Sequence, residues 1–174
     1  MTLFDVIIIG GGLSGSSTAI HLSSKGYSVL VIEKSNKKVK VPCAGGMASS
    51  IKALLPLNID EAIETEVKNV HFSWETGDNV VAKLSGESPF LIVKREKLDN
   101  LLIDKAKSEG AIMACSSEVT NIEKSCDSWN VQCNYQTIYR GKFLVVADGS
   151  ESRWSTFLKL GPQNPKYAQT AAIR

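Results

Sequence analysis

The stretch DVIIIGGGLSGSSTAIHLSSKGYSVLVIEKS, from Asp5 to Ser35, decides the fold. The β-branched run VIII at residues 6–9 predicts a strand buried on both faces. Glycines follow at once in the G-x-G-x-x-G spacing, and SSTAIHLSSK then predicts a helix that ends before Gly26. SVLVIE predicts a second buried strand with Glu33 at its end. Strand, glycines, helix, strand and acid therefore stand in the order of a dinucleotide-binding βαβ unit.

Each residue of this fingerprint has a physical role toward a dinucleotide. Gly10 allows a tight turn, Gly12 lets the backbone approach a pyrophosphate, and Gly15 lets the helix pack closely on the strand. The free N–H groups at the helix start, near residues 13–16, attract phosphate charge. Glu33 can accept hydrogen bonds from both hydroxyls of an adenosine ribose, and its charge disfavours the 2′-phosphate of NADP. The alternative is a glycine-rich turn in an ordinary βαβ unit, and the fingerprint alone does not separate FAD from NAD.

A second motif lies in FLVVADGSESR, from Phe143 to Arg153. FLVVA predicts another buried strand, and Asp148-Gly149 follows it directly. Ligands of a doubly wound sheet collect at the carboxyl ends of its strands, so this pair could reach a second part of the same cofactor. A plain Asp-Gly turn is the alternative interpretation.

Composition limits the remaining function classes. The chain has 174 residues, 43% of them hydrophobic and 22% charged, which is typical of one globular domain. Its net charge of +2 comes from scattered basic residues, which gives no indication of nucleic-acid binding. No secretory signal and no membrane span is expected, and the cysteines show no metal-binding spacing. We therefore expect a cytoplasmic protein with no metal site and with reduced thiols at Cys43, Cys115, Cys126 and Cys133.

The middle of the chain predicts shorter elements. The predicted helices are IKALLPL (51–57), one helical turn in DEAIETEV (60–67) and the amphipathic REKLDNLLIDKAKSEG (95–110). The predicted strands are VHFSW (70–74), VVAKL (80–84), FLIV (90–93), AIMAC (111–115), EVTNIEKS (118–125) and a segment in SWNVQCNYQTIY (128–139) that alternates from Trp129 through Tyr135. A hairpin turn is expected at Gly77-Asp78, a loop over residues 39–50, and the beginning of a strand in TAAIR (170–174).

Three local matches resemble the flavoprotein hydroxylase superfamily, whose fold is that of p-hydroxybenzoate hydroxylase. They are the opening stretch, VPCAGGM (41–47), and VKREKLDNLL…AKSEGA followed by VVADGSESR. Within the superfamily the resemblance is to the geranylgeranyl reductase family. That family's loop typically has a Pro-Cys-Gly-Gly type sequence, from which PCAGGM differs mainly by Ala44. Aromatic hydroxylases share the first and last motifs but not this loop.

The resemblance implies a set of FAD contacts and no catalytic residue. It places the fingerprint on the pyrophosphate, Glu33 on the adenosine ribose with Lys34 beside it, and the backbone of Val119 at the adenine. The other implied contacts are Gly10, Gly12, Leu13, Ser14 and Gly15 at the pyrophosphate, Cys43, Ala44 and Gly46 along the flavin side, Arg95 near FAD, and Asp148 and Gly149 near the pyrophosphate. Alternatives remain, since Arg95 could cap a solvated helix, Cys43 could fill a buried gap, and Val119 could be core only.

The fold implied is α/β, a Rossmann-like FAD/NAD(P)-binding three-layer domain with a small antiparallel β insertion. We expect this FAD-binding domain to span residues 1–160, with the insertion at about 68–93. Family members are longer and carry a later Gly-Asp motif and a substrate region. The chain is therefore expected to be C-terminally incomplete, with residues 161–174 starting a missing substrate domain.

The function implied is reduction of isoprenoid carbon–carbon double bonds by FAD, with NAD(P)H as the candidate external reductant. An isoprenoid or lipid-like substrate suggests peripheral contact with a membrane. Self-association, or a second chain supplying the missing part, is expected as well. Two alternatives stay open: a flavin-dependent aromatic monooxygenase, and a nucleotide-binding fragment with no catalysis of its own.

Overall fold

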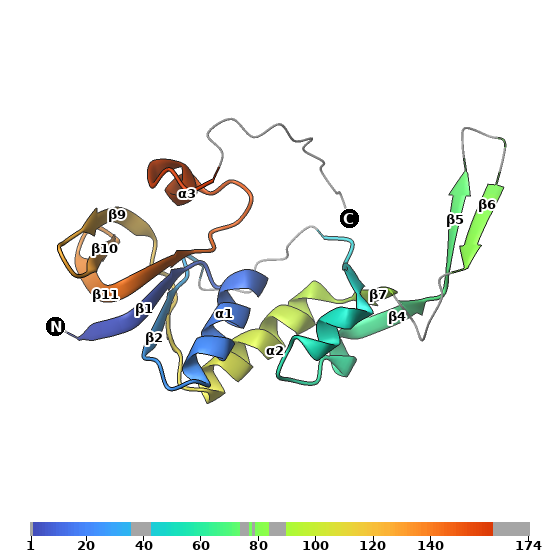
Figure 1. Cartoon of the computed structure of the whole chain (residues 1–174), viewed down its shortest axis with the longest axis horizontal. Helices are drawn as coiled ribbons and strands as arrows, with labels where there is room; N and C mark the ends of the chain where they lie inside the picture. The colour runs from blue at the N-terminus through green and yellow to red at the C-terminus, as the bar shows by residue number, and fades with distance from the viewer. Residues whose placement is uncertain (1, 36–42, 74–76, 78, 84–89, 162–174) are drawn as a thin grey trace. The chain divides into compact units, whose positions relative to one another are not determined.

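The computed structural model describes residues 2–35, 43–73, 77, 79–83 and 90–161 (Figure 1). The contacts divide the chain into two compact units. One draws its described residues from Met1–Val39 and Asp99–Gln169, the other from Lys40–Leu98. The expectations for residues 39–42, Trp74, Asp78 and 162–174, including the strand at 170–174, lie outside the described residues.

The first unit is built on a six-stranded sheet in the order β8-β2-β1-β11-β10-β9. Its strands are β1 (Leu3–Ile9), β2 (Val29–Ile32), β8 (Ile112–Ala114), β9 (Val119–Lys124), β10 (Trp129–Cys133) and β11 (Thr137–Val146). β1 pairs in parallel with both β2 and β11, and β2 pairs in parallel with β8. β9, β10 and the first half of β11 form an antiparallel meander. This arrangement confirms the predicted α/β class with a central parallel sheet.

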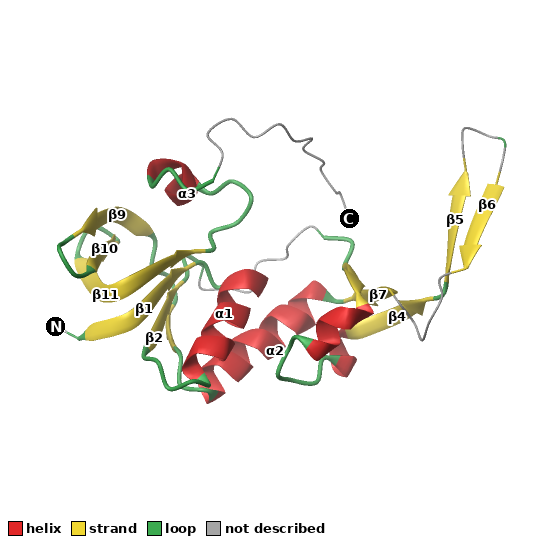
Figure 2. Cartoon of the chain, viewed as in Figure 1, coloured by secondary structure: helices red, strands yellow, loops and turns green. Residues whose placement is uncertain are grey.

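The sheet is covered on both faces, which explains the continuous β-branched runs in its sequence. α1 (Leu13–Ser23) lies against one face, where Gly15 approaches the Ile8 side chain. The other face packs against the meander in one core cluster, which joins residues of β1 and β2 to residues of β9, β10 and α3 (Arg153–Phe157). α1 therefore covers one face of the parallel strands, and side chains of β9, β10 and α3 cover the other; Figure 2 shows these elements around the parallel strands.

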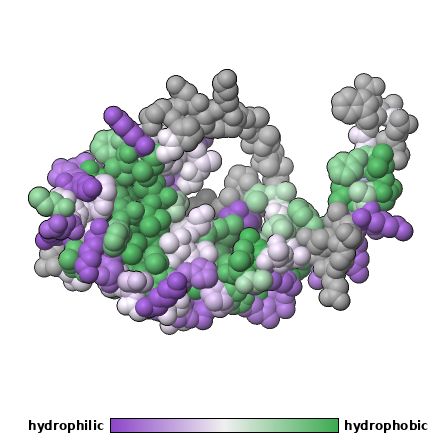
Figure 3. Space-filling model, in the orientation of Figure 1, coloured by the Kyte–Doolittle hydropathy of each residue, from purple (hydrophilic) through white to green (hydrophobic). Residues whose placement is uncertain are grey.

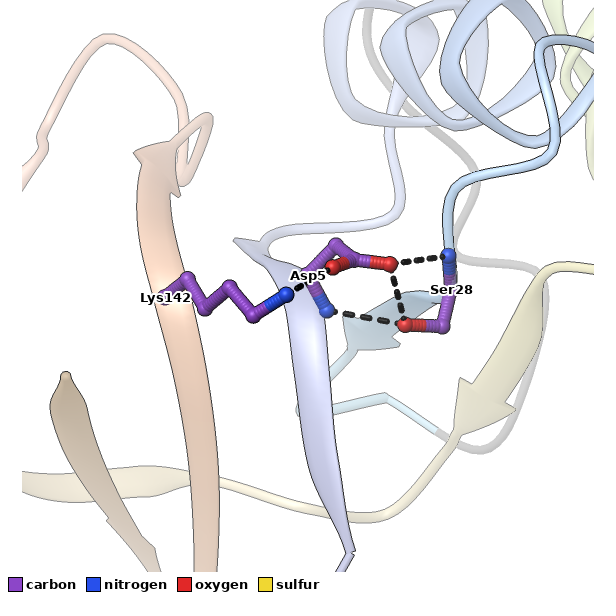
Figure 4. Close-up of polar contacts among 3 residues, drawn as sticks. All are labelled: Asp5, Ser28 and Lys142. Carbon is purple, nitrogen blue, oxygen red and sulfur yellow. Dashed lines mark hydrogen bonds and ion pairs between the residues drawn. The ribbon is translucent and has the colours of Figure 1, made fainter.

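Asp5 fastens β1 to both of its neighbours (Figure 4). Its Oδ1 accepts a hydrogen bond of 2.7 Å from Nζ of Lys142 on β11. Its Oδ2 accepts bonds from the amide and the hydroxyl of Ser28, just before β2, at 2.9 and 2.7 Å. These contacts hold the pKa of Asp5 well below its ordinary value of 3.8, the Lys142 hydrogen bond being the largest cause.

The second unit consists of two small antiparallel sheets and two short 3₁₀ turns. Its elements are β3 (Gly46–Ala48), η1 (Ser49–Ala53), η2 (Asp60–Ala62), β4 (Ile63–Val67), β5 (Asn69–Ser73), β6 (Asn79–Lys83) and β7 (Phe90–Val93). The sheets have the orders β3-β7-β4 and β5-β6. The β5–β6 hairpin carries hydrophobic side chains on its surface (Figure 3), since Phe72, Val80 and Val81 are exposed.

α2 (Arg95–Ser108) confirms the predicted amphipathic helix. Leu98, Leu102 and Ala106 are buried at the spacing of one helical face, and Gly110 follows with φ +101°. The boundary between the two units falls within this helix. No helix in the described part of the chain combines the length and the apolar character needed to cross a membrane.

Two local predictions were wrong, and one strand was missed. The helix expected at 51–57 is only the 3₁₀ turn Ser49–Ala53. The helical turn expected within 60–67 is present at Asp60–Ala62. Residues 63–67 form β4, which was not predicted because it depends on pairing with β7, a partner that local sequence does not reveal. The alternation predicted to run through Tyr135 ends at Cys133, because Asn134 and Tyr135 adopt positive φ angles in the β10–β11 turn.

Candidate functional site

A pocket of about 440 Å³ lies where β1, β2 and β11 end. These strands are parallel, so their carboxyl ends meet at one edge of the sheet, where ligands of this architecture bind. Its volume falls in the usual range of small-molecule sites. The pocket is lined by Ile9, Gly10, Gly12, Ile32, Glu33, Lys34, Ser117, Glu118, Val119, Ala147, Asp148, Gly149, Glu151, Arg153 and Trp154.

The fingerprint glycines have two different kinds of surroundings. A Cβ on Gly10 would stand 2.3 Å from the Ala147 carbonyl oxygen, and Gly10 has φ +99°. A Cβ on Gly15 would stand 1.9 Å from the Gly10 carbonyl oxygen. A Cβ on Gly12 would meet nothing within 4 Å, so this position opens on the pocket. Gly10 and Gly15 are therefore required by packing, whereas Gly12 leaves space for a ligand.

The first turn of α1 is suited to an anion. Gly12 is the N-cap, no side chain caps the helix, and the first turn holds no acidic residue. The first N–H groups of a helix have no acceptor within it, and the helix dipole adds positive potential there. Leu13, Ser14 and Gly15 are the residues that carry these groups. The turn and helix start can therefore receive a phosphate charge.

The Glu33 carboxylate is held in place by the backbone on both sides. Its Oε2 accepts a hydrogen bond of 2.8 Å from the Gly11 amide, and its Oε1 accepts one of 2.9 Å from the Ser35 amide. Each carboxylate oxygen keeps a further acceptor site, which leaves Glu33 able to bind the two hydroxyls of a ribose. Lys34 lies beside it in the pocket lining.

One wall of the pocket is the segment Ser117–Val119, and Asn134 anchors it. The Asn134 side chain donates to the Ser116 carbonyl at 2.9 Å and accepts from the Glu118 amide at 2.9 Å. Its own amide donates to the Glu118 carbonyl at 2.9 Å. Because the Val119 side chain is packed in the core, its backbone is the part available to a ligand.

A second part of the pocket lining comes from residues 147–154, the segment after β11. The Asp148 Oδ1 is buried and finds no hydrogen-bond partner among the described residues. Arg153 donates from Nη2 to the Val119 carbonyl, and its Nη1 lies 3.9 Å from Oε1 of Glu118. The guanidinium carbon stands 4.6 Å from the ring centroid of Trp154.

The predicted residues fall into three groups. The pocket brings together Gly10, Gly12, Glu33, Lys34, Val119, Asp148 and Gly149. Leu13, Ser14 and Gly15 form the first turn of α1. Cys43, Ala44, Gly46 and Arg95 belong to the second unit, where Cys43 Sγ accepts from the Gly45 amide at 3.4 Å and Arg95 begins α2.

Sequence analysis gave no role to three charged pocket residues, Glu118, Glu151 and Arg153. Arg153 closes the motif FLVVADGSESR, so a basic residue soon after Asp-Gly was the available signal. Nothing in the local sequence shows that Glu118 lies near it, because their contact depends on how β9 pairs with β10.

Known proteins are similar to this chain in sequence and in fold. A digeranylgeranylglycerophospholipid reductase of Methanococcus vannielii is 28% identical over 164 residues, which cover 90% of this chain and 41% of the relative. A FAD-dependent monooxygenase, olcE, of Penicillium canescens is 28% identical over 167 residues, covering 88% of this chain and 35% of the relative. A geranylgeranyl bacteriochlorophyll reductase-like structure from Thermoplasma acidophilum superimposes with a TM-score of 0.75 at 23% identity, covering 86% and 40% of the two chains.

These matches confirm the resemblance seen in the motifs, and they set its extent. The chain spans about two-fifths of the length of the curated reductase it matches. Residues 3–169 match the family described as FAD binding domain, nearly the whole of the chain. The chain belongs to the FAD binding domain family.

Proposed function

We propose that the pocket holds the adenosine and pyrophosphate half of FAD and that the bound flavin reduces isoprenoid carbon–carbon double bonds. One observation carries the cofactor part: Glu33 is fixed by the Gly11 amide beside the open position at Gly12. An acid for the ribose and an unobstructed turn for the phosphates thus stand next to each other.

The residues present fit this half of the cofactor. The start of α1 would face the pyrophosphate, Glu33 would accept from the ribose hydroxyls, and the Val119 backbone would meet the adenine. The unpartnered Asp148 Oδ1 offers an acceptor for a further hydroxyl of the cofactor. Cys43, Ala44, Gly46 and Arg95 are proposed to contact FAD as well, on the resemblance alone.

The reductase assignment rests on the loop VPCAGGM and on the reductase relatives. When bound between the start of α1, Glu33 and Val119, FAD would supply the two-electron chemistry that adds hydride and a proton across an alkene. NAD(P)H is proposed as the donor that restores the reduced form. The proposed substrate is isoprenoid or lipid-like, and we propose that the protein meets it by peripheral contact with a membrane.

A flavin-dependent monooxygenase is the second candidate. It is favoured by the match to the Penicillium canescens monooxygenase, whose identity to this chain equals that of the reductase. Aromatic hydroxylases lack the loop VPCAGGM, which is why we place the reductase first.

The native protein tests both candidates. Denaturation should release FAD, and added FAD should bind in preference to NAD or NADP. Because the chain covers only 41% of the reductase relative, the turnover assay uses a protein that carries this domain at the relatives' full length. Its anaerobic incubation with dithionite and a geranylgeranyl lipid should saturate double bonds, as seen by mass spectrometry. Hydroxylation of a phenol with NADPH and oxygen, without alkene reduction, would favour the monooxygenase. Tight NADP binding with no FAD binding would refute both candidates.

A further inference from the structure

Arg153 connects two segments that line the pocket, residues 147–154 and residues 117–119. It is the first residue of α3, in the segment that follows Asp148-Gly149, and its guanidinium reaches the Val119 carbonyl and the Glu118 carboxylate at the start of β9. The two segments share core packing, but no strand pairing joins them here, because β9 and β11 are not adjacent in the sheet.

The guanidinium is itself held in position. It lies over the ring of Trp154 at 4.6 Å from the centroid, and Trp154 is buried. Trp154 in turn packs edge-on against Phe157, with ring centroids 5.6 Å apart. A planar cation on an aromatic face gains cation–π attraction and loses rotamer freedom. Arg153 therefore approaches Val119 from a fixed direction.

The peptide group that Arg153 holds is part of the pocket wall. The Val119 side chain is anchored in the core, and Asn134 fixes the residues before it. The β9–β10 pairing is irregular between Gln132 and Cys133, beside Val119, and there the Arg153 bond gives the Val119 carbonyl a defined partner and direction. Peptide donors and acceptors discriminate between bases only when their direction is set, because an unpaired or misdirected polar group costs binding energy.

We propose that Arg153 is a positioning residue, which orients the Val119 backbone so that the pocket selects adenine over other purine bases. This inference rests on the proposed function, since it takes the base of FAD to lie at Val119. Lysine cannot replace arginine in this role, because a flexible ammonium group has neither the plane that rests on Trp154 nor the forked donors.

The experiment compares ADP with inosine diphosphate, which differ only in the edge of the base, by calorimetry. The variants are Arg153→Ala and Arg153→Lys. The matched control is Arg140→Ala, which removes an exposed arginine that bonds the Ser128 hydroxyl outside the pocket lining. FAD binding and the melting temperature without ligand are measured for each protein.

The native chain and Arg140→Ala should prefer ADP by about tenfold or more, the value of one well-directed hydrogen bond. In Arg153→Ala and Arg153→Lys, ADP and FAD should bind about tenfold more weakly and the preference over inosine diphosphate should fall to about twofold. An equal loss for both diphosphates, with the preference kept, would overturn the inference and leave Arg153 a general support. Full recovery in Arg153→Lys would overturn it too, by showing that charge alone suffices. If the native chain binds neither FAD nor ADP, the proposed function has failed first.

Discussion

The Gly11 amide donates a 2.8 Å hydrogen bond to the Glu33 carboxylate, which ties the acid at the end of β2 to the glycine turn after β1. The fingerprint acid thus has a structural task before any ligand arrives. The structural role and the proposed contact with the ribose involve the same carboxylate. The two effects can therefore be separated only by measuring ligand binding and protein stability on the same variants.

Replacing Glu33 by alanine should weaken FAD binding by about 1.5–3 kcal/mol, the range for hydrogen bonds to a charged group. It should also lower the melting temperature, since the Gly11 and Ser35 amides lose their acceptor. Fluorescence titration and thermal unfolding measure the two effects. Glu123→Ala is the control, because Glu123 is exposed and its carboxylate accepts a hydrogen bond from the Asn121 side chain rather than from the backbone. Unchanged FAD affinity in a folded Glu33→Ala protein would remove Glu33 from the site.

Gly12→Ala and Gly10→Ala should separate binding from folding. The new methyl group at Gly12 meets no protein atom, so stability should change by no more than about 1 kcal/mol while FAD affinity falls by about tenfold. At Gly10 the methyl group would collide with the Ala147 carbonyl at a positive φ, and we expect a loss of more than about 2 kcal/mol of stability. Chemical denaturation and calorimetry measure both. If FAD bound Gly12→Ala as tightly as the native chain, the pyrophosphate would lie elsewhere.

The Asp5 contacts should make stability depend on acid pH. Because the folded pKa of Asp5 lies below its ordinary value of 3.8, its contribution is complete above that value and is lost as pH falls further toward the folded pKa. The native chain should therefore be more stable than Asp5→Asn at pH 7, and the difference should shrink below about pH 4. Urea unfolding at several pH values gives this difference. Asp127→Asn serves as the control, and a difference for Asp5→Asn that did not vary with pH would contradict the linkage.

The four cysteines should differ in reactivity. Burial raises the pKa of Cys133 from 9.0 to about 11, and its side chain lies in the core, whereas Cys115 and Cys126 are exposed. At pH 8 a thiol reagent should modify Cys115 and Cys126 quickly and Cys133 only after unfolding. Peptide mapping by mass spectrometry identifies the modified residues. Rapid labelling of Cys133 in the native protein would mean that the meander opens readily.

Sequence alone predicted the parts of the fold that depend on local pattern. Each of these patterns lies within one continuous stretch of chain: the β-branched runs of β1 and β2, the glycine spacing, and the 3.6-residue periodicity of α2. The strand at residues 63–67 was not predicted, because its conformation is fixed by pairing with β7. In the same way Glu33 and Gly12 could be found from spacing, whereas the bond from Arg153 to Val119 joins segments whose contact only the folded sheet creates.

β11 meets two partners in succession, since its first residues pair antiparallel with β10 and its later ones pair in parallel with β1. Leu3 is thereby placed opposite Arg140, although the segment Lys40–Leu98 of the second unit lies between them in the chain. Closing so long a loop lowers the chain entropy before any β1–β11 contact has formed. The pairing of β1 with β11 should therefore form late during folding. During synthesis, the turn after β1 would leave the ribosome long before Asp148 and Gly149. Cofactor capture should accordingly wait until β11 and the residues that follow it have been made, and FAD, by spanning the ends of β1 and β11, would slow their separation once it is bound.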